Sequence, residues 1–238
     1  MKLDGAREED AKADGAGTVK AVAIDGPAGS GKSSVARVVA AAKGFLYVDT
    51  GAMYRAVALA ARRQNCDLED PAAMLAVAES ADLAFDASGT RLLLNGEDVS
   101  AEIRGPEVAR QVKFAARVPE IRARLVKRQR ALAESRPVVM EGRDIATVVL
   151  PRARWKFFLT AKPEVRARRR HAEMLAAGRE TDLDGILADI NVRDASDFQV
   201  GPMRDALELA RAGRGITLLD TSDLSPEEVV AAILARIH

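Results

Sequence analysis

The chain has 238 residues, 48% of them hydrophobic and 30% charged, which suits one α/β domain with a large core. Its 36 basic and 35 acidic side chains nearly cancel, so no overall charge favours DNA or a membrane surface. One cysteine and two histidines exclude a disulfide within the chain and argue against a metal site rich in either residue.

The first 18 residues are polar and acidic, unlike a signal peptide. No later stretch approaches the ~20 apolar residues of a membrane span. We therefore expect a disordered tail over residues 1–18, a single domain over residues 19–238, and a cytoplasmic protein.

Five short apolar runs are typical of buried parallel strands, and helical patterns lie between them. The expected strands are Val19–Ile24, Phe45–Val48, Val138–Met140, Trp155–Leu159 and Ile216–Leu219. The expected helices are Ser33–Ala42, Ala52–Arg63, Pro119–Ala133, Pro163–Ala177 and Pro226–Ile237. This alternation predicts an α/β fold with a doubly wound, five-stranded parallel sheet.

One segment departs from the alternation. Leu83–Phe85 and Thr90–Leu94 read as short strands on either side of a turn, and Asn95-Gly96 marks a second tight turn. An antiparallel pair of this kind does not fit a parallel sheet. We expect a small insertion over about residues 82–118.

A phosphate-binding loop follows the first strand. The residues Gly26-Pro27-Ala28-Gly29-Ser30-Gly31-Lys32-Ser33 fit the pattern G-x-x-x-x-G-K-[ST] at every fixed position. Glycines let successive N–H groups face one anion, and the helix N-terminus adds about half a positive charge. We expect this loop and Ser34 to bind the phosphates of ATP. Lys32 would reach the β- and γ-phosphates, and the Ser33 hydroxyl would bind Mg²⁺.

The loop alone does not separate GTPases, motor ATPases and small-molecule kinases. The N-K-x-D pattern that reads guanine is absent, and Asp86–Gly89 matches D-x-x-G only within the expected hairpin turn. No apolar run ends in an Asp-Glu pair, as it does in many motor ATPases. A small-molecule kinase is therefore favoured.

Two strand ends offer groups for a second phosphate. Thr50, which could cap the next helix, follows the second strand with Tyr54 and Arg55 one turn further on. Arg143 and Asp144 follow the third strand, where a structural ion pair is the alternative to a binding role. Ligands of open parallel sheets bind at the carboxyl ends of the strands, so these side chains are candidates for the acceptor.

Arginines also mark the later helices. The run Val165–Arg170 and the segment Arg193–Asp197 lie on two helices joined by a turn at Gly178–Thr181, which predicts a lid over about residues 163–200. Residues 104–136 carry ten basic side chains against three acidic ones, so an RNA-binding helix is an alternative. Aromatic stacking partners are scarce there, which argues against nucleic acid as a partner.

Together these segments resemble the bacterial cytidylate (CMP) kinases, a family of P-loop nucleoside monophosphate kinases. The motifs that carry the likeness are AIDGPAGSGKS, FLYVDTGAMYRAVAL, LNGEDVSAEIR, VMEGRDIATVV, VRARRR and INVRDASD, and it extends from about Val19 to His238. The resemblance implies ATP- and Mg²⁺-dependent phosphoryl transfer to CMP or dCMP. The insertion would belong to the substrate side, and the substrates would be small molecules bound by a monomer.

The resemblance also implies residue roles. Arg55, Arg143 and Arg193 would hold the acceptor phosphate or sugar, Arg122 and Asp144 would contact the cytosine edge, and Asp197 would bond to the ribose. Arg166, Arg169 and Arg170 would belong to the lid. The expected catalytic groups are Lys32, Arg143, Arg193 and Arg169, and the expected CMP site comprises Thr50, Tyr54, Arg55, Arg122, Arg143, Asp144, Arg193 and Asp197.

Three positions depart from the family pattern. Val200 stands where the lid motif usually ends in arginine, with Arg204 the nearest later one. Lys113 replaces a serine near the base, and Ala146 replaces a glycine. The first two concern base recognition, so UMP is an alternative acceptor. A kinase of another small metabolite and a nucleotide- or RNA-binding module without turnover are also compatible with the sequence.

Overall fold

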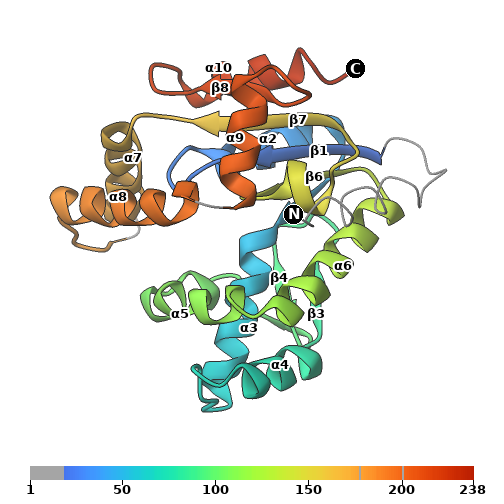
Figure 1. Cartoon of the computed structure of the whole chain (residues 1–238), viewed down its shortest axis with the longest axis vertical. Coiled ribbons are helices and arrows are strands. Elements are labelled where there is room, and N and C mark those ends of the chain that lie inside the picture. Colours follow the sequence, from blue (N-terminus) through green and yellow to red (C-terminus); the bar gives the residue numbers. More distant parts are fainter. Residues whose placement is uncertain (1–18, 177, 200) are drawn as a thin grey trace, which may run out of the picture.

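A computed structural model describes residues 19–176, 178–199 and 201–238. Its central sheet has five strands in the order β2-β6-β1-β7-β8 (Figure 1). All four pairings are parallel, and the strands are β1 Val19–Asp25, β2 Leu46–Asp49, β6 Val138–Gly142, β7 Ala153–Thr160 and β8 Thr217–Asp220. The predicted α/β fold with a five-stranded parallel sheet is confirmed.

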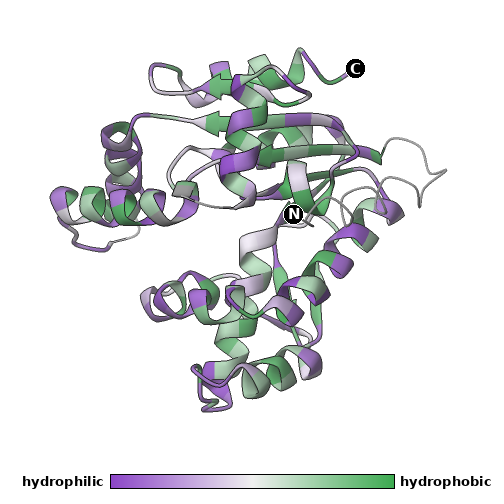
Figure 2. Ribbon diagram, viewed as in Figure 1, coloured by the Kyte–Doolittle hydropathy of each residue, from purple (hydrophilic) through white to green (hydrophobic). Residues whose placement is uncertain are grey.

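Helices cover both faces of this sheet. On one face α2 (Lys32–Lys43) and α10 (Pro226–Leu234) pack on Val22 and Ile24. On the other face α9 (Pro202–Arg211) and a short π-helix, η2 (Ile145–Val149), pack on Ala21 and Ala23. Successive side chains of β1 therefore pack into the cores on opposite faces of the sheet, and because both faces are buried the strand is an unbroken apolar run from Ala21 to Ile24. Figure 2 shows hydrophobic residues gathered in the strands.

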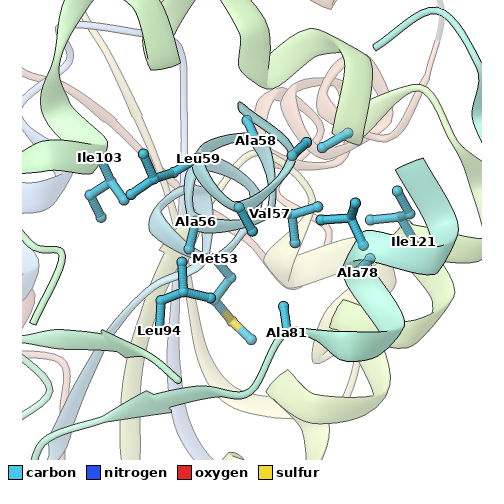
Figure 3. Close-up of a cluster of buried hydrophobic side chains, with 14 of the residues drawn as sticks. Met53, Ala56, Val57, Ala58, Leu59, Ala78, Ala81, Leu94, Ile103 and Ile121 are labelled. Carbon is cyan, nitrogen blue, oxygen red and sulfur yellow. The ribbon is translucent and has the colours of Figure 1, made fainter. Parts of the chain in front are cut away.

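A second lobe grows from α3 (Thr50–Arg63), which follows β2. Its other elements are α4 Pro71–Ser80, β3 Leu83–Phe85, β4 Leu92–Leu94, β5 Glu97–Asp98, the 3₁₀ turn η1 Glu102–Arg104, α5 Pro106–Ala116 and α6 Pro119–Ser135. Figure 3 shows Leu94, Ile103 and Ile121 around α3. The run Ala56–Ala61 is buried on every side, since α3 is the centre of this core. The core also takes in α6, so it is wider than residues 82–118, whose role on the substrate side stays a prediction.

The strands β3, β4 and β5 form their own antiparallel sheet, as the hairpin pattern predicted. Asn95 and Gly96, with φ of 51° and 84°, make the tight turn between β4 and β5. The turn between β3 and β4 contacts β2, an edge strand of the central sheet. There the Tyr47 N–H donates to the Ser88 carbonyl at 3.4 Å.

The helices α7 (Pro163–Ala176) and α8 (Leu183–Gln199) pair beside the end of β7 (Figure 1). Ala167, Ile186 and Ile190 form a small core of their own between them. Their action as a lid stays a prediction. Within the described part of the chain, no helix is both long and apolar enough to span a bilayer.

Gly89 is the residue that lets the β3–β4 turn approach β2. Its φ is 78°, and a Cβ there would lie 1.7 Å from the Tyr47 carbonyl oxygen. We expect Gly89→Ala to lower the free energy of unfolding by roughly 2–4 kcal/mol, measured by urea denaturation. Gly96→Ala is the matched control, because Gly96 has φ of 84° but open space at its Cβ, and should cost only about 1 kcal/mol. Equal losses would show that the contact with Tyr47 does not require glycine.

Candidate active site

The phosphate-binding loop lies between β1 and α2, at the carboxyl edge of the sheet. Gly26, Gly29 and Gly31 have φ of 149°, 76° and 88°, values that side chains rarely allow. A Cβ on Gly26 would lie 2.1 Å from the Leu159 carbonyl oxygen, so the loop is also packed against β7. Gly31 precedes α2 and offers no side-chain cap. The first N–H groups of α2 are therefore free of a side-chain partner and suited to an anion.

Lys32 and Ser33 open α2 beneath this loop. The Lys32 ammonium donates to the Pro27 carbonyl at 2.8 Å, so the lysine side chain folds back toward the phosphate-binding loop that precedes it. The Ser33 hydroxyl donates to Glu141 Oε1 at 2.6 Å. Burial lowers the pKa of Lys32, and the nearby Glu141 carboxylate opposes that shift.

Glu141 is a site residue to which the sequence analysis gave no role. It lies in β6, next to β1, is 5% exposed, and also accepts from the Tyr47 hydroxyl at 3.2 Å. Burial raises its pKa, and Asp49 adds to the rise. The one feature of the sequence that could have indicated a role for Glu141 is its position, as an acidic residue directly after the apolar run Val138–Met140.

A hydroxyl and a carboxylate at this point are hard oxygen donors of the kind that Mg²⁺ prefers. Within residues 19–176, 178–199 and 201–238, no group of three or more His, Cys, Asp or Glu side chains could hold a metal alone. Magnesium bound through nucleotide phosphates needs only one or two protein carboxylates, so Ser33 and Glu141 fit the ion.

The start of α3 corrects one expectation. Asp49, not Thr50, caps the helix, because the Asp49 carboxylate accepts the Ala52 N–H at 2.9 Å. The Thr50 hydroxyl donates to the Glu141 carbonyl at 2.8 Å and so ties α3 to β6. Asp49 Oδ2 also lies 2.7 Å from Arg55 Nη2 and 4.0 Å from Arg104 Nη2. Like Glu141 and Asp49, Arg104 is not among the site residues expected from the sequence.

Arg122 and Asp144, which the resemblance assigns to the cytosine edge, form an ion pair with each other, and their contact with a base stays a prediction. The Arg122 guanidinium of α6 donates to the Asp144 carboxylate at 2.5 Å and so links the second lobe to the bend after β6. Tyr54 lies within electrostatic reach of both groups, and burial raises the pKa of its hydroxyl. One half-buried ion pair and one aromatic ring thus face the same space.

Three guanidinium groups gather beside this pair. Arg143, at the bend after β6, bonds with both carboxylate oxygens of Asp197 on α8. Burial lowers the pKa of Arg193, and the neighbouring charges of Arg170 and Arg143 lower it further. Burial likewise raises the pKa of Asp197 against the pull of Arg143. Crowded guanidinium groups of this kind are stabilised by a bound anion.

Arg166 and Arg169 point elsewhere. Arg166 is 2% exposed and donates to the carbonyls of Ala161 and Ala28 at 2.9 and 3.2 Å, and it forms a two-pronged pair with Asp194. It therefore ties α7 and α8 to the phosphate-binding loop. Arg169 donates to the hydroxyl and the carbonyl of Thr221, after β8. Its expected catalytic role stays a prediction.

The three departures have different surroundings. Val200 lies outside the described residues. Arg204, which could have replaced an arginine there, pairs with Asp205 and Glu208 on its own helix at 3.5 and 3.6 Å. Lys113 is exposed, with its ammonium 5.0 Å from the centre of the Phe114 ring. Ala146 is buried, and its N–H donates to Asp25 at 2.8 Å.

A phosphate-binding loop at the edge of a parallel sheet, facing a second cluster of arginines, defines a P-loop kinase. A sequence model of the cytidylate kinases matches residues 22–238. The chain belongs to the cytidylate kinase family.

Individual relatives agree over nearly the whole chain. The cytidylate kinase of Caldanaerobacter subterraneus subsp. tengcongensis is 48% identical over 221 residues, which is 93% of this chain and 95% of that protein. The cytidylate kinase of Pelotomaculum thermopropionicum is 49% identical over 221 residues, with coverage of 91% and 95%. Both matches therefore extend over nearly the whole of this chain and of each relative.

Asp25 gives the site a pH-dependent stability. It is 0% exposed, and burial raises its pKa to about 7 from 3.8. The folded state thus binds the Asp25 proton more tightly than the unfolded state does. Protonation of Asp25 therefore stabilises the fold at low pH, and this contribution to the free energy of unfolding is lost as the pH rises toward 7. Between about pH 5 and pH 8, the stability of the wild type relative to Asp25→Asn should fall by roughly 1–3 kcal/mol. Urea denaturation of both proteins at each pH measures the difference, and a constant difference would contradict the raised pKa.

Proposed function

We propose that the protein transfers the γ-phosphoryl group of ATP to CMP or dCMP in a Mg²⁺-dependent reaction that yields ADP and CDP or dCDP. The observation that supports the proposal is that the glycine-rich loop with Lys32 lies within electrostatic reach of a second group of cationic side chains, Arg143 and Arg193. Lys32 and the loop glycines serve the donor, and Arg143 with Arg193 serves the acceptor. Membership of the cytidylate kinase family supports the same assignment.

The donor is held by the backbone of the loop and by Lys32. The Lys32 ammonium, which donates to the Pro27 carbonyl within the loop, binds the β- and γ-phosphate oxygens of ATP. The Ser33 hydroxyl and the Glu141 carboxylate would hold Mg²⁺. When bound there, the ion would supply positive charge to the phosphates of the donor.

The acceptor lies between the two lobes. Arg143, Arg193 and Arg55 bind its phosphate, and Asp197 turns from Arg143 to the ribose hydroxyls. Asp144 accepts from the exocyclic amine of cytosine, and Arg122 donates to the ring acceptors. Uracil carries a carbonyl in place of that amine, so it sets an oxygen against the Asp144 carboxylate. The unpaired groups would cost on the order of 1–3 kcal/mol.

Catalysis follows from position and charge. Arginines on the acceptor side and Lys32 on the donor side neutralise the phosphoryl oxygens during an in-line transfer. The ion pairs Arg143–Asp197 and Arg55–Asp49 keep the cationic site stable before substrate arrives, and a phosphate can replace either carboxylate. The helices α7 and α8 close over the site and exclude water, which would otherwise accept the phosphoryl group.

The proposed setting is the cytoplasm, where ATP and nucleoside monophosphates are available, and the proposed active form is a monomer.

A coupled ADP-release assay with ATP and Mg²⁺ tests the function directly. CMP, dCMP, UMP, AMP and GMP serve as parallel acceptors, and we expect CMP or dCMP to lead. Lys32→Ala should lower kcat by at least about a hundredfold while the thermal unfolding curve stays cooperative. Near-wild-type turnover in this variant would remove the loop from the mechanism. A wild type that phosphorylates no nucleotide would favour a kinase of another metabolite or a binding module without turnover.

Asp144→Asn tests how the base is read. The amide can donate to the uracil carbonyl, so the ratio of kcat/KM for CMP to that for UMP should fall about tenfold or more. Arg143→Ala is the matched control, because loss of a phosphate contact lowers kcat/KM for both acceptors and leaves their ratio unchanged. An unchanged ratio in Asp144→Asn would exclude Asp144 from base recognition.

A further inference from the structure

We propose that Asp25 is a positioning residue for the acceptor, holding the bend that carries Arg143 and Asp144. The inference rests on the proposed function, because those two residues are the ones assigned to the acceptor phosphate and base. Asp25 itself contacts neither proposed substrate. It acts through the backbone of η2, the short helix that follows the bend after β6.

Asp25 makes two backbone hydrogen bonds with η2. It is the last residue of β1, is fully buried, and lies opposite Gly142 in the register with β6. Its Oδ1 accepts the Ile145 N–H and its Oδ2 accepts the Ala146 N–H, both at 2.8 Å. These are the first two N–H groups of η2, and the Asp144 side chain before them caps neither.

A helix normally meets its first N–H groups with a side chain just before it in sequence. Here the cap comes from a different strand, about 120 residues earlier. Because Ile145 directly follows the acceptor residues, the carboxylate of Asp25 fixes where the backbone leaves the bend at Arg143 and Asp144.

The bend is also held at its other side. The Thr50 hydroxyl donates to the Glu141 carbonyl at 2.8 Å. A Cβ on Gly142 would lie 2.5 Å from the same hydroxyl oxygen and 2.7 Å from Ile145 Cδ1. The two acceptor residues therefore lie between two fixed points, which limits how far their side chains can move from the acceptor.

The same residue connects the acceptor with the donor. Gly26, the first residue of the phosphate-binding loop, directly follows Asp25. Burial lowers the pKa of the Lys32 ammonium, and the Asp25 carboxylate lies close enough to oppose that shift. The end of β1 thus continues directly into the ATP loop and, through two hydrogen bonds of Asp25, also positions the backbone of the acceptor bend. Because both segments are attached to the same strand end, the distance between the donor and acceptor phosphates is constrained.

Only a carboxylate serves both N–H groups at once. It offers two acceptor oxygens, whereas an asparagine of the same shape would set an NH₂ group against one backbone N–H. Burial raises the pKa of Asp25 to about 7, so keeping it ionised opposes stability. A residue that is unfavourable for stability yet satisfies two amides of the bend points to a role in placing the acceptor.

The test is Asp25→Asn at about pH 8, where the wild-type carboxylate is ionised. We expect the KM for CMP to rise about tenfold, with the KM for ATP changed less than about twofold. Equilibrium titration with CMP alone should show the same loss of affinity. Hydrogen exchange at Ile145 and Ala146 should accelerate about tenfold, while exchange in the core strand β7 stays unchanged.

Asp70→Asn is the matched control. Asp70 also accepts two backbone N–H groups, from Ala72 and Ala73 at the start of α4, in the second lobe. The same substitution there should leave both KM values unchanged. An unchanged KM for CMP in Asp25→Asn, or an equal rise for ATP and CMP, would overturn the proposal.

The proposed function fails separately if the wild type does not phosphorylate CMP. In that case hydrogen exchange decides the role of Asp25 by itself. Faster exchange at Ile145 and Ala146 supports Asp25 as the anchor of the bend, and unchanged exchange overturns it.

Discussion

The pairing of β1 with β6 is the constraint on which the site depends. The register sets Asp25 opposite Gly142, so the phosphate-binding loop and the Arg143–Asp144 bend leave the sheet side by side. Because β1 and β6 run parallel, the segments that follow them begin at the same edge of the sheet. Ser33 then meets Glu141 across the strands, and the Asp25 carboxylate meets the start of η2. A shift of one residue in this register would separate every one of these contacts.

This arrangement concentrates ionisable groups where water is scarce. Asp25, Glu141 and Arg166 are each at most 5% exposed. Buried charges contribute little to stability even when they are well paired, because desolvation offsets most of the attraction. The stability of the fold must come from the apolar cores on either side of the sheet and in the second lobe. The charges are better explained by what they hold in place.

Much of this could be predicted from the sequence, because its signals are local. Buried parallel strands are continuous apolar runs, and the phosphate-binding loop has fixed spacing, so the sheet and the donor loop were both foreseen. The helices α4, α5 and α9 were not. The α4 sequence PAAMLAVAES is apolar on nearly every side and shows no clear helical period, although Asp70 and Pro71 are a recognisable start signal.

The sequence could not decide which charged side chain faces which partner. Asp49 and Thr50 are adjacent, and both residue types cap helices, so only the structure shows that Asp49 does so. Within Val165–Arg170, four arginines fall on one and a half turns of α7. The fold buries Arg166 against Asp194 and directs Arg169 to Thr221. Glu141 was missed because its partner Ser33 is 108 residues away along the chain.

The contact of the β3–β4 turn with β2 has a consequence beyond the site. As an edge strand, β2 would present unpaired backbone groups that could template the addition of a foreign strand. The Ser88 carbonyl takes the Tyr47 N–H, and Gly89 lies directly against the Tyr47 carbonyl, so the turn covers the middle of this edge. By covering the edge of β2, this turn of the second lobe prevents that strand from pairing with the same edge of another copy of the chain. A movement that opened the lobe far enough to release this turn would expose the strand to aggregation, which sets an outer limit on how widely the protein can open between turnovers.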